Sequence, residues 1–173
     1  MHDRRRSLRV SLFVILLALP FAAASSRGED VAHPAGRNVA DMQFVGIPGL
    51  PSCSKASVQS GDPSKGASIL LAKLETGCSF PWHWHTPTEN LMLVSGEGRV
   101  ETKDDGKALA LRAGGFAQMP SRHVHQFSCA MECTLYVFSD GAFDMHYVNA
   151  EGKEISPEDA MKSVGETATK APE

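Results

Sequence analysis

The sequence has no marked excess of charge of either sign. Its 173 residues carry 17 Lys and Arg against 20 Asp and Glu, which gives a formal net charge of −3. Nucleic-acid-binding domains usually present a strongly basic face. Four of the arginines lie within residues 4–9, in a segment that we expect to be removed. The remaining chain is more acidic still, so we expect no nucleic-acid partner.

Several motifs that define common enzyme classes are also missing. The sequence has no glycine-rich phosphate-binding loop, no nucleophile elbow built around a serine, and no second carboxylate dyad. It has no internal repeat and no low-complexity segment. These absences argue against a P-loop enzyme, a serine hydrolase of the elbow type and a repeat protein.

A long hydrophobic run is the third feature that the sequence lacks. Residues 10–19 are apolar except for one serine; they follow a basic start and precede three alanines at 22–24. A transmembrane helix needs about 20 apolar residues, whereas this arrangement is typical of a signal peptide. We predict a signal peptide over residues 1–24, export to the periplasm or the exterior, and no stable membrane span after cleavage. An uncut membrane anchor is the alternative.

Export makes the four cysteines, Cys53, Cys78, Cys129 and Cys133, candidates for disulfide bonds. Cys129 and Cys133 flank a three-residue segment and could face each other across a hairpin, in which case Cys53 would pair with Cys78. The alternative is four unpaired, buried cysteines that act as small hydrophobic residues. Their spacing does not fit a zinc finger, so we do not count them as metal ligands.

Short apolar or alternating segments recur at intervals of roughly ten residues through the middle of the chain. Glycine, proline and aspartate separate them, as is typical of turns. The pattern predicts an all-β barrel or double-sheet jelly roll. The expected strands are 56–59, 67–74, 89–94, 99–103, 108–111, 116–119, 126–129, 134–138 and 143–148. For 67–74 a helix is the alternative, and 126–129 with 134–138 should form a hairpin.

The composition divides the chain into four parts. After the signal peptide, residues 25–42 are polar and aperiodic and are expected to form a flexible leader. The domain proper covers residues 43–149. Residues 150–173 are a polar tail, in which Ser156 and Pro157 can cap one short helix reaching about Lys162.

The most informative stretch is residues 77–96, which hold two histidines and a carboxylate within seven positions. Strand geometry points His83 and His85 to the same side. After a turn at residues 86–88, Glu89 could return on the neighbouring strand and face the same point. A second histidine cluster, His123 and His125, lies further along. Histidine and carboxylate side chains that converge on one point in this way are typical of a metal site.

The stretch resembles a known family. Gly77-x5-His83-x-His85-x3-Glu89-x6-Gly96 is a complete match to the first motif of the cupins. The resemblance covers about residues 44–148 and extends to small single-domain bacterial cupins of the type-2 kind, a subfamily of undefined biochemistry. It implies a single-domain cupin jelly roll, also called a double-stranded β-helix barrel.

The second cupin motif is matched in most positions by Gly114-x5-Pro120-x4-His125. Two positions depart from it. Arg122 stands where a glycine is usual. This residue changes the turn that presents His125 but need not displace the histidine. Cys129 stands where an asparagine is frequent, which removes a hydrogen-bonding side chain. Neither departure costs a metal ligand.

The resemblance implies that His83, His85, Glu89 and His125 bind one divalent metal ion. Three imidazoles and one carboxylate suit Fe, Mn, Ni, Co or Zn, and the sequence does not choose among them. Four protein ligands leave two adjacent positions of an octahedron for O₂, water or a substrate.

Strand phase suggests the residues around such an ion. Leu91 and Leu93 are in phase with Glu89, and Phe127 is in phase with His125, so these three should line the barrel interior near the metal. The further candidates for pocket residues are His123, with an ordinary polar loop position as its alternative, and two hydrogen-bonding side chains, Gln118 and Tyr136. The tryptophans at 82 and 84 must point away from the histidines.

These observations predict an exported, divalent-metal-binding cupin that acts on a small molecule as a metal-dependent oxidoreductase of the dioxygenase type. A non-redox isomerase, lyase or decarboxylase is one alternative. A metal- or ligand-binding module without catalysis is the other, because this fold hosts all three classes. By resemblance, the protein is also expected to form a homodimer.

Overall fold

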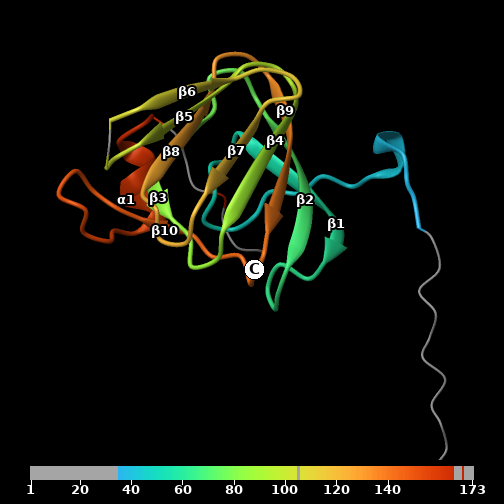
Figure 1. Cartoon of the computed structure of the whole chain (residues 1–173), viewed down its shortest axis with the longest axis horizontal. Helices are drawn as coiled ribbons and strands as arrows, with labels where there is room; N and C mark the ends of the chain where they lie inside the picture. The colour runs from blue at the N-terminus through green and yellow to red at the C-terminus, as the bar shows by residue number, and fades with distance from the viewer. Residues whose placement is uncertain (1–34, 105, 166–168, 170–173) are drawn as a thin grey trace, which may run out of the picture. The chain divides into compact units, whose positions relative to one another are not determined.

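The computed structural model describes residues 35–104, 106–165 and 169 (Figure 1). The predicted signal peptide and most of the predicted leader lie outside these residues. The chain divides into a unit of residues 1–36 and a unit of residues 37–173, and the elements found among the described residues lie in the second unit. Its elements are η1 (Val39–Asp41), β1 (Ser54–Gly61), β2 (Ser68–Leu74), β3 (Ser79–Trp84), β4 (Glu89–Ser95), β5 (Gly98–Thr102), β6 (Ala108–Leu111), β7 (Phe116–Met119), β8 (His125–Cys129), β9 (Cys133–Ser139), β10 (His146–Tyr147) and α1 (Pro157–Lys162).

The strands form two five-stranded sheets with antiparallel pairing throughout (Figure 1). One sheet has the order β1-β2-β9-β4-β7 and the other has the order β10-β3-β8-β5-β6. The predicted all-β jelly roll is therefore confirmed, and residues 68–74 form a strand rather than a helix. Apart from the pairs β1–β2 and β5–β6, each connection carries the backbone from one sheet to the other, so sequence neighbours often face each other across the core.

The predicted hairpin of residues 126–129 and 134–138 is wrong. Strand β8 pairs with β3 and β5, whereas β9 pairs with β2 and β4 in the other sheet. The three residues between Cys129 and Cys133 therefore cross between the sheets instead of turning back within one. The disulfide between these two cysteines joins the sheets at this crossing.

The core lies between the two sheets, and both sheets contribute to it. An inward-facing row crosses one sheet through the register Leu70–Val137–Leu91–Ala117. The buried core cluster consists of Leu74, Cys78, Leu91, Leu93, Val100, Leu111, Ala117, Met119, Phe127, Cys129, Cys133 and Leu135. Alternation of apolar and polar residues along the strands produces this single buried layer.

Glycine is required at the turn between β4 and β5. Gly96 has a φ of 89°, and a Cβ atom there would lie 2.2 Å from the carbonyl oxygen of Glu132. At Gly98 a Cβ atom would lie 2.8 Å from the ring of Phe127. Both glycines therefore allow the backbone to pass close to its neighbours, which closes this end of the barrel.

The chain after Ala150 is more than a polar tail. Ser156 caps α1 by accepting a hydrogen bond from the backbone N–H of Asp159, with Pro157 at the first helical position. Ala160 and Met161 of this helix are buried against Tyr147, and α1 lies beside β3 and β10 (Figure 1). Ala160 and Met161 are the buried residues of this short helix, and two apolar side chains are too weak a signal for composition to indicate docking. Within the described part of the chain, no helix has both the length and the apolar character to cross a membrane.

Candidate metal centre

Four buried side chains converge at one end of the barrel. His83 lies on β3, His85 directly after it, and His125 at the start of β8, where it is the cross-strand partner of His83. Glu89 begins β4, which belongs to the opposite sheet. The expected return of Glu89 on a neighbouring strand is therefore wrong: the turn at residues 86–88 carries it across the barrel. All four residues are at most 6% exposed, and their ligand atoms lie within 4.8 Å of one another.

Backbone carbonyl groups orient the three imidazoles. The Nδ1 atoms of His83, His85 and His125 lie 2.6, 2.5 and 2.9 Å from the carbonyl oxygens of Pro81, Asp144 and His123. A carbonyl oxygen only accepts hydrogen bonds, so each Nδ1 carries the proton. In the neutral ring the opposite nitrogen, Nε2, is then left with a free lone pair.

These lone pairs face a carboxylate. Oε2 of Glu89 lies 3.3 Å from Nε2 of His125 and 3.6 Å from Nε2 of His85. Among the described residues, the buried Nε2 of His85 finds no hydrogen-bond partner. Buried acceptors that converge without a donor are unfavourable unless a cation lies among them. The four residues therefore fit a divalent metal ion, and three His with one Glu is a donor set suited to a first-row metal.

The electrostatics of the cluster favour the protonation states that a metal requires at His83 and at Glu89. Burial, with His125 and His85 nearby, lowers the pKa of His83 well below its ordinary value, so this ring is neutral. Burial alone would raise the pKa of Glu89, but the adjacent His85 and His125 outweigh it and hold the pKa well below the ordinary range. Burial also opposes protonation of His85, yet the charge of Glu89 raises its pKa. A carboxylate and at least one neutral imidazole are thus ready to bind an ion.

Asp144 ties the segment before β10 to the cluster. Besides the bond from His85 to its carbonyl, its carboxylate accepts a hydrogen bond of 2.7 Å from the backbone N–H of Thr86. The Asp144 carboxylate also lies 3.3 Å from Nε2 of His146. Sequence reasoning missed Asp144, because its contact with His85 spans 59 positions.

Arg122, which departs from the cupin motif, adopts the backbone conformation that favours glycine. Its φ is 61°, and its N–H donates a 2.8 Å hydrogen bond to the carbonyl of His85. The guanidinium lies 4.6 Å from the centre of the Trp84 ring, which stacks on His146 at 3.9 Å. A cation–π contact of this kind offsets part of the strain of a left-handed arginine. The departure thus preserves the turn that presents His125.

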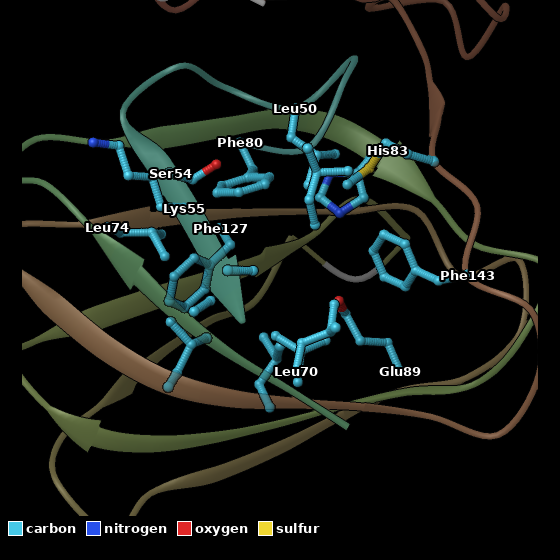
Figure 2. Close-up of a pocket in the computed structure, with 17 residues that line it drawn as sticks. Leu50, Ser54, Lys55, Leu70, Leu74, Phe80, His83, Glu89, Phe127 and Phe143 are labelled. Carbon is cyan, nitrogen blue, oxygen red and sulfur yellow. The ribbon is translucent and has the colours of Figure 1, made fainter. Parts of the chain in front are cut away.

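An apolar cavity adjoins the cluster (Figure 2). Its volume is about 60 Å³, and His83 and Glu89 are the two members of the cluster that lie on its wall. The remaining lining residues are Ile47, Leu50, Ser54, Lys55, Ala56, Leu70, Ala72, Leu74, Phe80, Leu91, Phe127, Leu135, Val137, Phe143 and Met145. An ion bound by the four residues would therefore face a mainly hydrocarbon-lined space.

The structure divides the predicted pocket residues into two groups. Leu91 and Phe127 line the cavity, and Leu93 is packed in the core without lining it. Gln118, Tyr136 and His123 do not line it. Gln118 is exposed and donates a hydrogen bond to Asn90.

Tyr136, Gln118 and His123 lie outside the cavity for identifiable physical reasons. Along β9 the inward positions are those of Leu135 and Val137, so Tyr136 points to the outer face, where it pairs with Leu71 and Met92. The same alternation turns Gln118 outward on β7. His123 precedes β8 and lies 3.6 Å from the carboxylate of Asp104.

Four lining residues that sequence reasoning missed come from irregular segments. Ile47 and Leu50 belong to the arm before β1, and Phe143 and Met145 belong to the segment before β10. The Phe143 ring lies 4.9 Å from the His85 ring. The apolar character of both segments was visible in the sequence, but their meeting depends on the fold.

All four cysteines are paired. Cys53 is bonded to Cys78, which ties the residue before β1 to the residue before β3, and Cys129 is bonded to Cys133. Cys78, Cys129 and Cys133 are at most 1% exposed. Cys78, Cys129 and Cys133 belong to the hydrophobic core cluster, and Cys53 packs against it.

Comparison with known proteins agrees with this fold. Residues 70–139 match the family model of the cupin domain. A solved RmlC-like cupin from Shewanella frigidimarina is 18% identical over 64% of this chain and 93% of its own, with a TM-score of 0.53. A polyketide cyclase from Streptomyces resistomycificus is 15% identical over 68% and 87%, with a TM-score of 0.58. An RmlC-like cupin from Ralstonia eutropha is 18% identical over 72% and 78%, with a TM-score of 0.56.

These likenesses show the fold and nothing finer, because the identities are low. No curated protein sequence matches the chain. The two sheets and the structural neighbours show the fold of a cupin jelly roll, and residues 70–139 carry the match to the cupin-domain model.

Proposed function

We propose that this protein is an exported metalloenzyme of the dioxygenase type that acts on a small molecule. His83, His85, Glu89 and His125 would hold one divalent ion. The observation that carries the proposal is the position of His83 and Glu89 on the wall of the apolar cavity. An ion held there would have an apolar cavity beside it, as is typical of a small-molecule reaction site.

The chain's own residues orient the donors and exclude water. The carbonyl groups of Pro81, Asp144 and His123 fix the imidazole rings, and the hydrocarbon lining keeps the space beside them dry. When bound, a redox-active ion such as iron or manganese can activate O₂, and any of the candidate metals can polarise an oxygen atom of a substrate.

The dioxygenase hypothesis is favoured because, among the described residues, the cavity wall offers no free side chain to act as a general acid or base. Apart from His83 and Glu89, its polar members are Ser54 and Lys55. The Ser54 hydroxyl donates to the carbonyl of Pro51, and the Lys55 amine points away from the cavity (Figure 2). An isomerase or lyase that needs a protein acid or base would find no free one here.

Oxygen consumption by protein loaded with Fe(II) tests the proposal. Elemental analysis of protein isolated from its native compartment identifies the metal. A panel of small carboxylic acids and phenols should then include compounds that produce O₂ uptake, and His83→Ala should abolish it. Conversion of a compound without O₂, or native protein that holds only zinc, would favour the non-redox alternative. Binding without any turnover would favour a ligand-binding module.

Export is the second part of the proposal. It is supported by the pairing of all four cysteines, because disulfides persist in oxidising compartments such as the periplasm. Fractionation of cells that produce the full chain tests it. We expect a mature protein shortened by about 24 residues outside the cytoplasm, and a full-length cytoplasmic protein would contradict it.

A homodimer is the third part. Met92 and Phe116 form a cross-strand pair on the outer face of their sheet, and they are 41% and 55% exposed. Adjacent exposed apolar side chains that form a contiguous patch can mark a protein–protein contact surface. Sedimentation should give twice the mass of one chain, and Phe116→Glu should give the single chain; a monomeric wild-type protein would contradict the proposal.

A further inference from the structure

The cavity beside the metal centre has a second compartment outside it. Four side chains, Ile47, Leu50, Phe143 and Met145, line both the inner cavity and an outer pocket of about 260 Å³. These four side chains, here called the partition, therefore stand between the two spaces. The outer pocket is completed by Pro48, Gly49, Asp144, Tyr147 and Pro157.

The partition belongs to loops rather than to strands. The other apolar members of the inner wall, such as Leu70, Leu91 and Val137, lie on strands that are paired on both sides. The partition residues lie in two irregular segments, 46–50 and 141–145. Side chains on such segments can shift more readily than those locked in a paired sheet. The partition is thus the wall through which a ligand can reach His83 and Glu89.

The size of the inner cavity sets what it can hold. One water molecule needs about 10–15 Å³ of such space, so about 60 Å³ accommodates only a few water-sized groups. A ligand with more atoms must displace the partition and extend into the outer pocket. The inner cavity alone therefore holds only the part of the ligand nearest to His83 and Glu89.

The lining of the inner cavity sets the chemistry of the ligand. Its Ser54 hydroxyl is already bonded to Pro51, and the Lys55 amine points outward (Figure 2). A sugar would bury several hydroxyl groups there without partners, which is unfavourable. A hydrocarbon group would instead gain from burial among leucines and three phenylalanines, Phe80, Phe127 and Phe143.

We infer that the site takes a small molecule with an aromatic or short aliphatic body and one oxygen-bearing group, such as a carboxylate or a carbonyl. The oxygen-bearing group lies at the His83–Glu89 end, and the body lies among the apolar side chains of the wall and, where it exceeds the inner cavity, reaches past the partition into the outer pocket. This inference rests on the proposed metal centre and narrows its substrate class. It excludes polyhydroxylated substrates.

Two probes of equal chain length test the inference. Hexanoate and gluconate share a six-carbon chain and a carboxylate, but gluconate carries hydroxyl groups along its body. Protein is loaded with Zn(II), its metal content is measured first, and the dissociation constants are then obtained by calorimetry. We expect hexanoate, and benzoate as an aromatic counterpart, to bind at least tenfold more tightly than gluconate.

Variants separate the roles of the wall and the partition. Phe143→Ala should raise the association rate constant of hexanoate several-fold, measured by stopped flow. The matched control is Phe116→Ala, on the outer face of the sheet, which should leave that rate constant unchanged. Val137→Thr adds a hydroxyl to the wall at nearly constant volume and should narrow the preference for hexanoate over gluconate by at least threefold.

The outcomes distinguish this inference from the proposed function. Protein that binds no zinc at the four residues overturns the metal centre itself. Zinc-loaded protein that binds gluconate as tightly as hexanoate, or binds none of the probes, overturns only the substrate class. An unchanged rate constant in a folded Phe143→Ala variant overturns the partition as the route of entry.

Discussion

The two ends of the barrel are built on the same strands and are equally well buried, but they bury opposite kinds of side chain. Strand β8 runs from His125 to Cys129, and β4 runs from Glu89 past Leu93. At the beginning of these strands lie imidazoles and a carboxylate with an adjoining cavity. At the far end lie Leu93 and the disulfide-bonded Cys129 within the apolar core.

This difference indicates that the apolar end mainly stabilises the fold and that the end with the four candidate ligands carries the chemistry. The apolar end gains free energy by removing hydrocarbon surface from water and by close packing. The metal end buries groups that are unfavourable without an ion, next to a wall of loops. A protein retains such an arrangement where it binds something. The two ends should therefore respond differently to substitution.

The largest effect on stability should come from the apolar end. Leu93 is 2% exposed and does not line the cavity. Leu93→Ala should lower the free energy of unfolding by about 2–5 kcal/mol, through lost burial and the void that remains. Urea denaturation measures the change. The folded variant should still bind one metal ion per chain, and loss of the metal without loss of stability would contradict the division between the two ends.

The disulfides should contribute according to the length of chain that each one closes. Cys53–Cys78 spans 25 positions and Cys129–Cys133 spans 4. The chain-entropy relation gives about 3.5 kcal/mol for the longer loop and about 1.9 kcal/mol for the shorter. Urea denaturation of the two double Cys→Ser variants should reproduce this order. A larger loss from the Cys129/Cys133 pair would show that its junction between the sheets matters more than loop entropy.

Acid should weaken the metal-free protein through the cluster. Glu89 has a folded-state pKa below its ordinary value of 4.5, so its contribution is present above pH 4.5 and is lost as the pH falls through the folded-state pKa. His83 has a folded-state pKa below 6.5, so stability also decreases as the pH falls below 6.5. His85 acts in the opposite sense, because its raised pKa adds stability at low pH that is lost as the pH rises.

Urea denaturation of metal-free protein from pH 7 to pH 3 measures this dependence. In Glu89→Gln the decline below pH 4.5 should become shallower, because the group that titrates there is gone. An identical pH dependence in wild type and Glu89→Gln would show that the carboxylate is not coupled to the histidines. Leu93→Ala serves as the control, since it should shift the whole curve without changing its shape.

The smallest effect is expected at Arg122. Arg122→Gly relieves a left-handed conformation that costs about 1 kcal/mol or slightly more, and it loses a cation–π contact with Trp84 worth about 0.5–1 kcal/mol. The two changes nearly cancel, so the unfolding free energy should change by less than about 1 kcal/mol. Arg122→Ala loses the contact and keeps the strain, so it should be the less stable variant. The reverse order would contradict this account of the turn.

The sequence predicted the fold and grouped the four candidate ligands because both signals are local. Motif spacing and the two-residue period of a strand identify which side chains share a face. Strand period does not say which strand is the partner, so Glu89 and the 126–129/134–138 pair were assigned to the wrong neighbours. The two-residue period of the strand places Tyr136 on the outer face of the sheet, because its neighbours Leu135 and Val137 point inward. The partition could not be predicted from the sequence, because it forms where two loops about 95 residues apart in the chain meet.

Metal stoichiometry in a matched pair of histidine variants tests the central claim most directly. His125 lies in the buried cluster, whereas His123, two residues earlier, has a side chain that is 28% exposed and lies near Asp104. Titration with Zn(II), followed by elemental analysis, should give one ion per chain in wild type and in His123→Ala, and none in folded His125→Ala. Full occupancy in His125→Ala, or none in wild type, would contradict the metal centre.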